Sequence, residues 1–369
     1  RRVRSEFYTV NSYRIAVIPG DGIGAEVIPE GVRVLEALAH WTSELQLEFQ
    51  NFDWGSERYL AHGQMIPDGG LKTLSEFDAI YFGSAGDPRV PDHITLWELR
   101  LKICQGFEQY ANVRPARLLR GVRSPLAGIG PTDLDWVIVR ENSEGEYAGV
   151  GGRSHQNYPE EVAMDVSVFT RAGVERIHRF AFELARSRPR RLLTLVTKSN
   201  AQRHGMVMWD QVFEEIAADY PEVTTDRILV DAMTTRMVLQ PQSLDVVVAT
   251  NLHADILSDL AAALSGSLGI AATANLRPER DYPSMFEPIH GSAFDLVGKG
   301  IANPIGALWT ASMMLEHLGA RAASTQLMAA IEKVTSTGRV MPADLGGHAT
   351  TREVTDAVIV EVEKSGSDA

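Results

Sequence analysis

Apolar, β-branched segments alternate with amphipathic segments along the chain, and this alternation restricts the possible folds more than any other feature. Predicted strands cover residues 13–18 (YRIAVI), 45–52, 79–82, 136–140 (WVIVR), 192–197, 227–230 and 244–249. Predicted helices cover residues 25–39, 167–187 and 200–219. Apolar residues also recur at helical spacing from Leu96 to Tyr110, before Arg114 and Pro115 stop that element. Strands that alternate with helices indicate an α/β fold with a largely parallel sheet.

Size and charge limit the classes of protein to which the chain can belong. Its 369 residues are enough for one large domain or two ordinary ones. No Pro-, Gly- or Ser-rich linker divides the sequence, so two domains would have to be tightly joined or interleaved. The net charge of −13 argues against nucleic acid and acidic membrane surfaces as partners, and any basic site must therefore be local.

The sequence carries no sign of export or membrane insertion. A single cysteine, Cys104, excludes an internal disulfide and is typical of a reducing compartment. No run of about 18 apolar residues is present, so we expect no membrane span. The segment RRVRSEF is basic but has no continuous apolar region, so we expect no secretory signal in it and a cytoplasmic location.

Two aspartates four residues apart suggest a metal site. Asp255 and Asp259 (LHADILSDL) fall in a predicted helix, where this spacing places both carboxylates on one face. Two like charges there destabilise a helix by roughly 0.2–0.5 kcal/mol, so a bound cation would explain them. Hard oxygen ligands without a nearby Cys or His cluster favour Mg²⁺ or Mn²⁺ over zinc. The alternative is a solvated acidic helix face.

A glycine-rich turn after the first strand has two interpretations. Gly20, Gly22 and Gly24 (PGDGIGA) resemble the Rossmann dinucleotide fingerprint, with Glu44 or Glu48 as the acidic residue about twenty positions on. The spacing G-x-G-x-G with an internal acid is imperfect, however. A tight turn that joins strand and helix without contacting a nucleotide explains the pattern equally well, and the residues alone leave both interpretations open.

Two further groups of residues favour an anionic ligand. The first group consists of Arg114 (ANVRP) and Arg140 (WVIVREN), and Arg140 ends a predicted strand. Arginine at a strand end can bind a carboxylate through two hydrogen bonds. The segment EPIHGSAFD, residues 287–295, is dense in Gly, Pro, His and Asp, so its backbone N–H groups can approach an anion. Taken singly, each arginine is better explained as a surface charge, and His290 as an ordinary loop histidine.

Taken together, these segments resemble one family over nearly the whole chain, from Tyr13 to about Val362. The matching segments are IPGDGIG, ANVRP, VRENSEGEY, VTKSN, VDAM, DILSD, EPIHGSAFD, GKGIANP and DLGG. They resemble the metal-dependent β-decarboxylating dehydrogenases, which include isopropylmalate, isocitrate, homoisocitrate and tartrate/D-malate dehydrogenases. Jointly the segments are highly specific. The resemblance implies an α/β, isopropylmalate dehydrogenase-like fold of two interleaved domains, which is not a Rossmann fold.

The resemblance also implies how the chain is organised. Residues 1–109 and 266–369 would form the large, cofactor-binding domain. Residues 110–265 would form an inserted central domain with the dimer interface and the metal and substrate residues. The active unit would be a homodimer with shared active sites, because Lys198 and Asp231 would serve the site of the partner chain.

The matching positions carry the expected chemistry. Asp255 and Asp259, with Asp231 from the partner chain, would hold the divalent ion that binds the hydroxyl and the adjacent carboxylate of the substrate. Lys198, also from the partner chain, would act as base toward the hydroxyl proton. Tyr147 would deliver a proton to the substrate carbon that loses CO₂.

The expected cofactor site lies in the second glycine-rich region and not in the first turn. The resemblance implies that it consists of Glu287, His290, Gly291, Asp295 and Asn303. Asp295 matches the position that binds the adenosine ribose in NAD-using members, and a carboxylate there repels a 2′-phosphate, so NAD is favoured over NADP. The choice between Mn²⁺ and Mg²⁺ stays open, as does the use of a monovalent cation such as K⁺.

The arginines at the expected substrate site determine which substrate we expect the protein to use. Arg114 and Arg140 match the arginines that bind the substrate carboxylates. Cys104 stands where the family usually has its first substrate arginine, and Arg100 lies one helical turn earlier, where isopropylmalate enzymes have a leucine of the apolar pocket. An Arg100 that points inward favours a small C4 dicarboxylate such as tartrate or D-malate. The alternative is an Arg100 that points to solvent and leaves the pocket apolar.

We therefore expect an NAD- and metal-dependent dehydrogenase of the tartrate/D-malate type. It would oxidise a 2-hydroxy dicarboxylate and decarboxylate the keto acid formed from D-malate. Within the family, 3-isopropylmalate dehydrogenase and then isocitrate dehydrogenase are the alternatives. A catalytically silent regulatory subunit is an alternative from another class, but Tyr147, Lys198 and the three aspartates are all present.

Overall fold

The computed structural model describes residues 11–42 and 45–367. Its strands are β1 Asn11–Gly20, β2 Leu45–Asn51, β3 Ala79–Ser84, β4 Ala111–Arg117, β5 Asp135–Glu141, β6 Gly145–Ser154, β7 Val162–Val168, β8 Leu192–Thr197, β9 Thr224–Leu229, β10 Val246–Ala249, β11 Ala272–Leu276 and β12 Ser284–Pro288. Its helices are α1 Gly24–Trp41, α2 Ser56–His62, α3 Gly70–Leu74, α4 Asp92–Thr95, α5 Leu101–Gly106, α6 Arg171–Ser187, α7 Gly205–Ala217, α8 Val230–Leu239, α9 Asn251–Leu264, α10 Ile305–Leu318, α11 Arg321–Thr337 and α12 Thr351–Ser367. All seven predicted strands and the three predicted helix ranges coincide with observed elements, with shifts at their ends.

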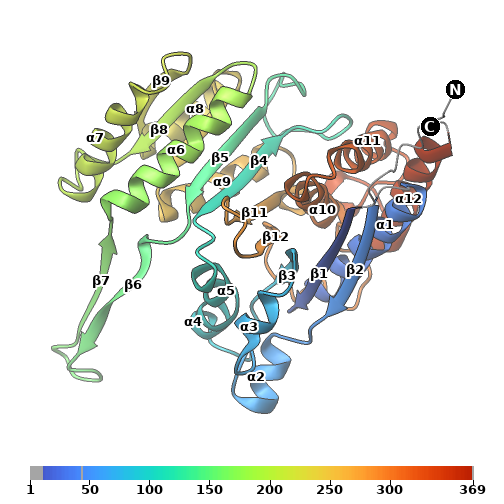
Figure 1. The fold of residues 1–369 in the computed structure, drawn as a ribbon, viewed down its shortest axis with the longest axis horizontal. Helices are drawn as coiled ribbons and strands as arrows, with labels where there is room; N and C mark the ends of the chain where they lie inside the picture. Colours follow the sequence, from blue (N-terminus) through green and yellow to red (C-terminus); the bar gives the residue numbers. More distant parts are fainter. Residues whose placement is uncertain (1–10, 43–44, 368–369) are drawn as a thin grey trace, which may run out of the picture.

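A single ten-stranded sheet runs through the molecule in the order β2-β1-β3-β12-β11-β4-β5-β10-β8-β9 (Figure 1). The strands are parallel at both ends of the sheet. At its centre, β11 runs antiparallel to β12 and β4, and β4 runs antiparallel to β5. The α/β prediction is confirmed, but the sheet is mixed, and a mixed centre distinguishes it from the parallel Rossmann sheet.

One predicted element boundary is wrong. The helix after Leu96 ends at Gly106, and Arg114 and Pro115 do not stop it but lie inside strand β4. Proline removes a backbone N–H, so it is unfavourable between two paired strands. Pro115 is tolerated because β11 pairs only with the start of β4, at Ala111 to Val113.

Strands that are far apart in the sequence lie side by side. β3 pairs with β12, and β4 pairs with β11, so the chain leaves the first half of the sheet after β3 and returns to it only at β11. Such a path produces an interleaved arrangement. The proposed division into residues 1–109 with 266–369 and residues 110–265 stays a prediction.

Helices cover both faces of the sheet and bury three apolar clusters. The largest cluster includes Val17, Tyr81, Ile138 and Phe286 and packs under α1, α9 and α10. A second cluster joins α6 and α7 to β8 and β10, and a third joins the β1 and β3 side chains to the segment from α2 to α5. The sheet is therefore a rigid support for the side chains at its centre.

A two-stranded hairpin, β6–β7, extends away from the main body (Figure 1). Its exposed apolar residues include Val150, Met164 and Val166. The predicted helix over residues 167–187 begins later, at Arg171, because the preceding residues form β7 and the Thr170 side chain accepts a hydrogen bond from Gly173 N at 3.0 Å.

None of the helices in residues 11–42 and 45–367 is long and apolar enough to cross a membrane. The segment RRVRSEF, for which we expect no secretory signal, lies outside the described residues.

Candidate active site

Helix α9 presents two carboxylates, and the first lies among cationic side chains. Arg140 on β5 forms an ion pair with Asp255 Oδ1, and Arg114 Nη1 on β4 lies 3.2 Å from the same oxygen. Tyr147 Oη on β6 donates to Asp255 Oδ2 at 3.0 Å. Burial disfavours the charge of Asp255, but the neighbouring arginines outweigh it and lower the pKa of this carboxyl. Asp255 is therefore ionised at neutral pH.

Asp259 lies one turn further along α9, and its charge is less well compensated. Burial raises the pKa of Asp259; the charge of Arg114 opposes this effect, and the charge of Asp255 adds to it. Two neighbouring carboxylates with hard oxygen donors fit a divalent cation such as Mg²⁺ or Mn²⁺. The solvated acidic face is not supported for Asp255, because its oxygens are bound by buried groups.

Two guanidinium groups are buried at the centre of the sheet. Arg114 and Arg140 are only 6% and 2% exposed. Arg114 donates to Asn112 Oδ1 at 2.9 Å and Ser258 Oγ at 2.5 Å, and Arg140 Nε donates to Asn251 Oδ1 at 2.8 Å. Burial, together with the charge of Arg140, lowers the pKa of Arg114 to about 10. Two buried cations beside one carboxylate leave positive charge that an anionic ligand would compensate.

A π-helical turn, Leu96–Arg100, directs Arg100 into the same site. Arg100 Nε and Nη2 lie 2.7 and 2.6 Å from Glu287 Oε1 on β12, and the Arg100 side chain is 12% exposed. Burial opposes its charge, but Glu287 prevails and raises the pKa of Arg100. Burial raises the pKa of the Cys104 thiol to about 11, while the nearby charge of Arg100 acts in the opposite direction. Arg100 therefore points inward near the small cysteine, and the solvent-pointing alternative is wrong.

A cavity of about 150 Å³ joins the arginines to the predicted cofactor loop. Its walls include Arg100, Arg114, Glu287, His290 and Gly291. These residues come from the π-helical turn, from β4, from β12 and from the loop that follows β12. The fold thus brings three predicted cofactor residues and two predicted substrate residues to one space.

The loop after β12 rests on the glycine turn after β1. Ile23 N–H donates to Ser292 O at 2.8 Å. A Cβ atom at Gly22 would lie 2.0 Å from that carbonyl oxygen, so only glycine permits this approach. The backbone of this turn contacts another segment of the same chain, whereas the backbone of a Rossmann turn contacts the pyrophosphate of the dinucleotide. The Rossmann interpretation of the turn is wrong, and the turn supports the second loop.

The second loop has the features of a ligand-binding segment. His290 is 9% exposed, and burial lowers its pKa. Its Nε2 is buried without a hydrogen-bond partner in the described part of the chain, and a bound polar ligand would satisfy it. A side chain at Gly291 would meet only open space, and Asp295 is exposed. These residues fit a dinucleotide that lies along the loop.

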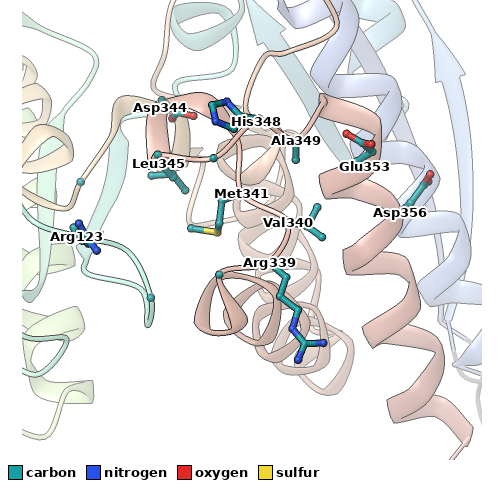
Figure 2. A pocket seen from close by; sticks show the side chains of 15 residues that line it. Arg123, Arg339, Val340, Met341, Asp344, Leu345, His348, Ala349, Glu353 and Asp356 are labelled. Carbon is teal, nitrogen blue, oxygen red and sulfur yellow. The ribbon is translucent and has the colours of Figure 1, made fainter.

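Asn303 is hydrogen-bonded to a residue in the wall of a larger cavity of about 1020 Å³, which Figure 2 shows. Asn303 Nδ2 donates to Asp344 Oδ2 at 2.9 Å, and Ser267 Oγ binds the same oxygen. Asp344 lines the cavity with Met341 and His348 (Figure 2). The DLGG segment thus holds Asn303 in place from the far side.

Lys198 and Asp231 lie apart from this cluster. Lys198 follows β8, Asp231 lies in the first turn of α8, and the two form an ion pair. The hydrogen bond from Lys198 lowers the pKa of Asp231. Within the described residues of one chain, no group of three or more His, Cys, Asp or Glu side chains is placed to hold a metal ion. One chain therefore brings Asp255 and Asp259 together but not Asp231.

Sequence reasoning missed three buried asparagines at the site. Asn112, Asn142 and Asn275 are at most 2% exposed, and the side-chain amides of Asn112 and Asn142 both donate to Asn275 Oδ1. One signal could have revealed them: asparagine is depleted in strands, so Asn112 in ANVRP and Asn275 in ATANL are unusual there.

Comparison with known proteins identifies the family. The sequence profile of isocitrate/isopropylmalate dehydrogenase matches residues 14–358. The chain belongs to this family. A probable tartrate dehydrogenase/decarboxylase from Agrobacterium vitis is 63% identical over 349 residues, which cover 95% of this chain and 96% of that protein. D-malate dehydrogenase (decarboxylating) from Escherichia coli K12 is 52% identical over 357 residues, which cover 95% of this chain and 98% of that protein.

Solved structures of the family have the same fold. Isocitrate dehydrogenase from Methylococcus capsulatus matches with a TM-score of 0.85 and 35% identity over 95% of this chain and 99% of its own. The TT0538 protein from Thermus thermophilus matches with a TM-score of 0.84 and 34% identity over 95% of this chain and 68% of its own. The expected interleaved α/β fold of this family is confirmed.

Proposed function

We propose that the chain is an NAD- and metal-dependent dehydrogenase that oxidises tartrate and D-malate and decarboxylates the keto acid formed from D-malate. The names of its relatives, tartrate dehydrogenase/decarboxylase and D-malate dehydrogenase (decarboxylating), support this interpretation at 63% and 52% identity. The observation that supports the substrate class is the group of buried arginines Arg100, Arg114 and Arg140, of which Arg100 and Arg114 line a small cavity.

The arginines bind and orient the substrate. Arg114 and Arg140 each present a nearly fully buried guanidinium, and a carboxylate of the diacid can replace Asp255 as their partner. Arg100 lines the small cavity together with Arg114, and its charge favours a polar C4 dicarboxylate over a substrate with an isopropyl group. The alternatives, 3-isopropylmalate and isocitrate, therefore fit this cavity less well.

The carboxylates form the metal site of the proposal. Asp255 and Asp259 of one chain, with Asp231 of a second copy, hold one divalent ion. When bound, Mn²⁺ or Mg²⁺ lowers the pKa of the substrate hydroxyl and stabilises the negative charge that develops on its oxygen. Asp255 suits this role because its pKa is already lowered. Arg140, which pairs with Asp255 in this structure, would be the arginine nearest to a substrate carboxylate at this metal site.

Two side chains move protons in the proposed reaction. Lys198 of the second copy takes the proton of the substrate hydroxyl as the carbon below it loses hydride. Tyr147 then delivers a proton to the carbon from which CO₂ departs. Burial and the charge of Asp255 raise the pKa of Tyr147, so its phenol keeps its proton at neutral pH until that step. Both residues are present, which argues against a catalytically silent subunit.

The loop after β12 forms the cofactor site of the proposal. NAD, when bound, accepts the hydride from the hydroxyl-bearing carbon. Glu287, His290 and Gly291 border the cavity next to the substrate arginines, so they would hold the nicotinamide end, and Asn303 lies further along the loop. The exposed Asp295 would bind the adenosine ribose and repel a 2′-phosphate.

A homodimer completes the proposed active site. Asp231 pairs with Lys198 outside the Asp255 cluster, and its side chain is 64% exposed. Large apolar residues are exposed nearby on α8 and α9, namely Leu239 and Ile256, at 71% and 55%. The exposed apolar hairpin β6–β7 adds further surface for a second copy. A cytoplasmic location is part of the proposal, and it is based on the single, buried Cys104.

A substrate panel tests the proposed function. We expect the purified protein, with NAD and Mn²⁺ or Mg²⁺, to give its highest kcat/KM for D-malate or a tartrate stereoisomer. A strong preference for 3-isopropylmalate or isocitrate would contradict the assignment of Arg100. Added K⁺ shows whether a monovalent cation assists. A folded dimer that turns over none of the four substrates in the presence of metal would support the regulatory alternative.

A further inference from the structure

Buried amides form a row across the centre of the sheet. Asn275 on β11 is the register partner of Asn112 on β4, and Asn112 is in turn the partner of Arg140 on β5. Directly opposite residues present their side chains on the same face of a sheet. The amides therefore lie on the face that carries the substrate arginines. Asn275 and Asn112 are both 0% exposed, and a buried polar side chain in a strand requires partners.

The hydrogen bonds of the row all run in one direction. Arg114 Nε donates to Asn112 Oδ1 at 2.9 Å. Asn112 Nδ2 donates to Asn275 Oδ1 at 2.6 Å, and Asn275 Nδ2 donates to Glu287 Oε1 at 2.8 Å. Each donor points from the cation toward the carboxylate, so the two amide dipoles align and strengthen each other. The row thus connects a substrate arginine to the carboxylate at the start of the cofactor loop.

Asn275 is the branch point of this row. Its Oδ1 also accepts from Arg100 Nη2 at 3.3 Å and from Asn142 Nδ2 at 3.1 Å. Arg100 forms an ion pair with Glu287, so the Asn275 amide touches both members of that pair through opposite ends. An amide has an acceptor oxygen and a donor nitrogen at separate ends, so Asn275 can accept from the Arg100 guanidinium and donate to the Glu287 carboxylate.

We propose that Asn275 is a positioning residue that fixes Arg100, Arg114 and Glu287 in one geometry. It is fully buried and does not border the small cavity, so it acts on the substrate through the arginines. Its amide determines how the carboxylates of the diacid are held relative to the cofactor loop. This inference rests on the proposed function, since it takes Arg100 and Arg114 as the groups that bind the diacid.

Two substitutions at this position remove different parts of the network. Asn275→Ala leaves the donors of Arg100 and Asn112 and the acceptor of Glu287 without this partner. Asn275→Asp keeps the acceptor oxygen but loses the donor, and it places a second carboxylate beside Glu287. We expect either change to raise the KM for the diacid about tenfold to hundredfold, the range for a lost hydrogen bond to a charged group.

The decisive test is a double-mutant cycle with Arg100→Leu. If Asn275 acts in part through Arg100, Asn275→Ala is expected to cost a smaller factor in kcat/KM once Arg100 is gone, because only the route through Asn112 to Arg114 then remains. A merely structural role predicts the same factor in both backgrounds. Calorimetric titration with the diacid, in the presence of the divalent ion, gives a second readout that does not depend on turnover, and the affinity is expected to fall in parallel with the KM.

Gln109→Leu is the matched control. Gln109 is also 0% exposed, and its side-chain amide donates to Pro283 O at 2.8 Å; only its backbone carbonyl, which the substitution keeps, accepts from Asn142. The control is expected to lower the unfolding temperature and to leave the KM for the diacid unchanged. The positioning role is wrong if Asn275→Ala leaves that KM unchanged, or if it costs the same factor with and without Arg100.

Two provisions keep the test independent of folding and of the proposed substrate. If neither Asn275 variant folds, Asn112→Ser interrupts the same row from β4, and an unchanged KM for the diacid in that variant overturns the proposal. The diacid used is the one that the unmodified protein turns over best. A preference for 3-isopropylmalate would overturn the proposed function and would still allow the role of Asn275 to be measured.

Discussion

Subunit mixing offers a sharp test of the shared active site. One variant, Tyr147→Phe, lacks the proposed proton donor, and a second variant, Lys198→Met, lacks the proposed base. Tyr147 lies with Asp255 in one cluster, whereas Lys198 pairs with Asp231 apart from it. Each variant alone is expected to be inactive as a homodimer, because every one of its sites lacks one of the two groups.

The expected activity of the mixture follows from the arrangement of these two pairs. Random exchange of subunits makes about half of the dimers mixed. In a mixed dimer, one site combines both defects, and the other combines an intact Tyr147 cluster with an intact Lys198. The mixture is therefore expected to recover about one quarter of the activity of the unmodified protein, since about half of the dimers carry one working site of two.

The assay is D-malate-dependent NADH formation after joint denaturation and refolding of two differently tagged variants. Sequential purification on both tags isolates the mixed dimer and shows that exchange occurred. If each site used Tyr147 and Lys198 of the same chain, the mixed dimer would contain two defective sites. An inactive mixed dimer would thus refute the sharing of sites, whereas activity in either variant alone would refute the role of the substituted residue.

Three further predictions concern specificity, cofactor and stability. Arg100→Leu is expected to lower kcat/KM for D-malate about tenfold to hundredfold, since a hydrogen bond to a charged group contributes roughly 1.5–3 kcal/mol. The kcat/KM for 3-isopropylmalate should fall less. If the ratio of the two kcat/KM values is unchanged in a substrate panel, Arg100 does not determine specificity. Asp295→Ala is expected to raise the KM for NAD several-fold, and an unchanged value would argue against the second loop as cofactor site. His178 is fully buried with both ring nitrogens unpaired in the described structure, and burial lowers its pKa to about 3. The unfolded chain binds a proton at His178 below about pH 6.5, whereas the folded chain binds it only near pH 3. The free energy of unfolding therefore decreases as the pH is lowered from about 6.5 toward 3, by about 2 kcal/mol at pH 5. His178→Leu should remove that part of the pH dependence in urea unfolding at pH 7 and pH 5; an identical pH dependence would show that His178 does not cause it.

The alternation of apolar segments predicted the strands that lie under helices, but not the antiparallel centre of the sheet. β11 and β12 are short, and ATANL and SMFEP lack the β-branched runs that mark β1 or β5. β4 contains Pro115, which normally argues against a strand between two others. The hairpin β6–β7 is rich in glycine and packs against little, so no periodicity marks it. These elements depend on long-range pairing, which local patterns do not record.

For the site, the i, i+4 spacing predicted that Asp255 and Asp259 share a helix face, and α9 has this geometry. The direction of Arg100 could not be decided from sequence, because it depends on the π-helical turn and on Glu287 from a distant strand. The asparagine row was invisible for a similar reason. Asn112 and Asn275 meet only through the register of β4 and β11.

The close contact between Gly22 and Ser292 joins two segments that are far apart in the sequence. Any larger residue at Gly22 would displace the loop that follows β12, so under the proposed function such a substitution would weaken NAD binding without altering a residue of the proposed cofactor site. A genetic screen for reduced coenzyme affinity would thus recover changes near the amino-terminal turn. A motif search that assigns phosphate binding to this turn would also predict weak cofactor binding in such mutants, but it would attribute the loss to a direct contact and not to the displaced loop.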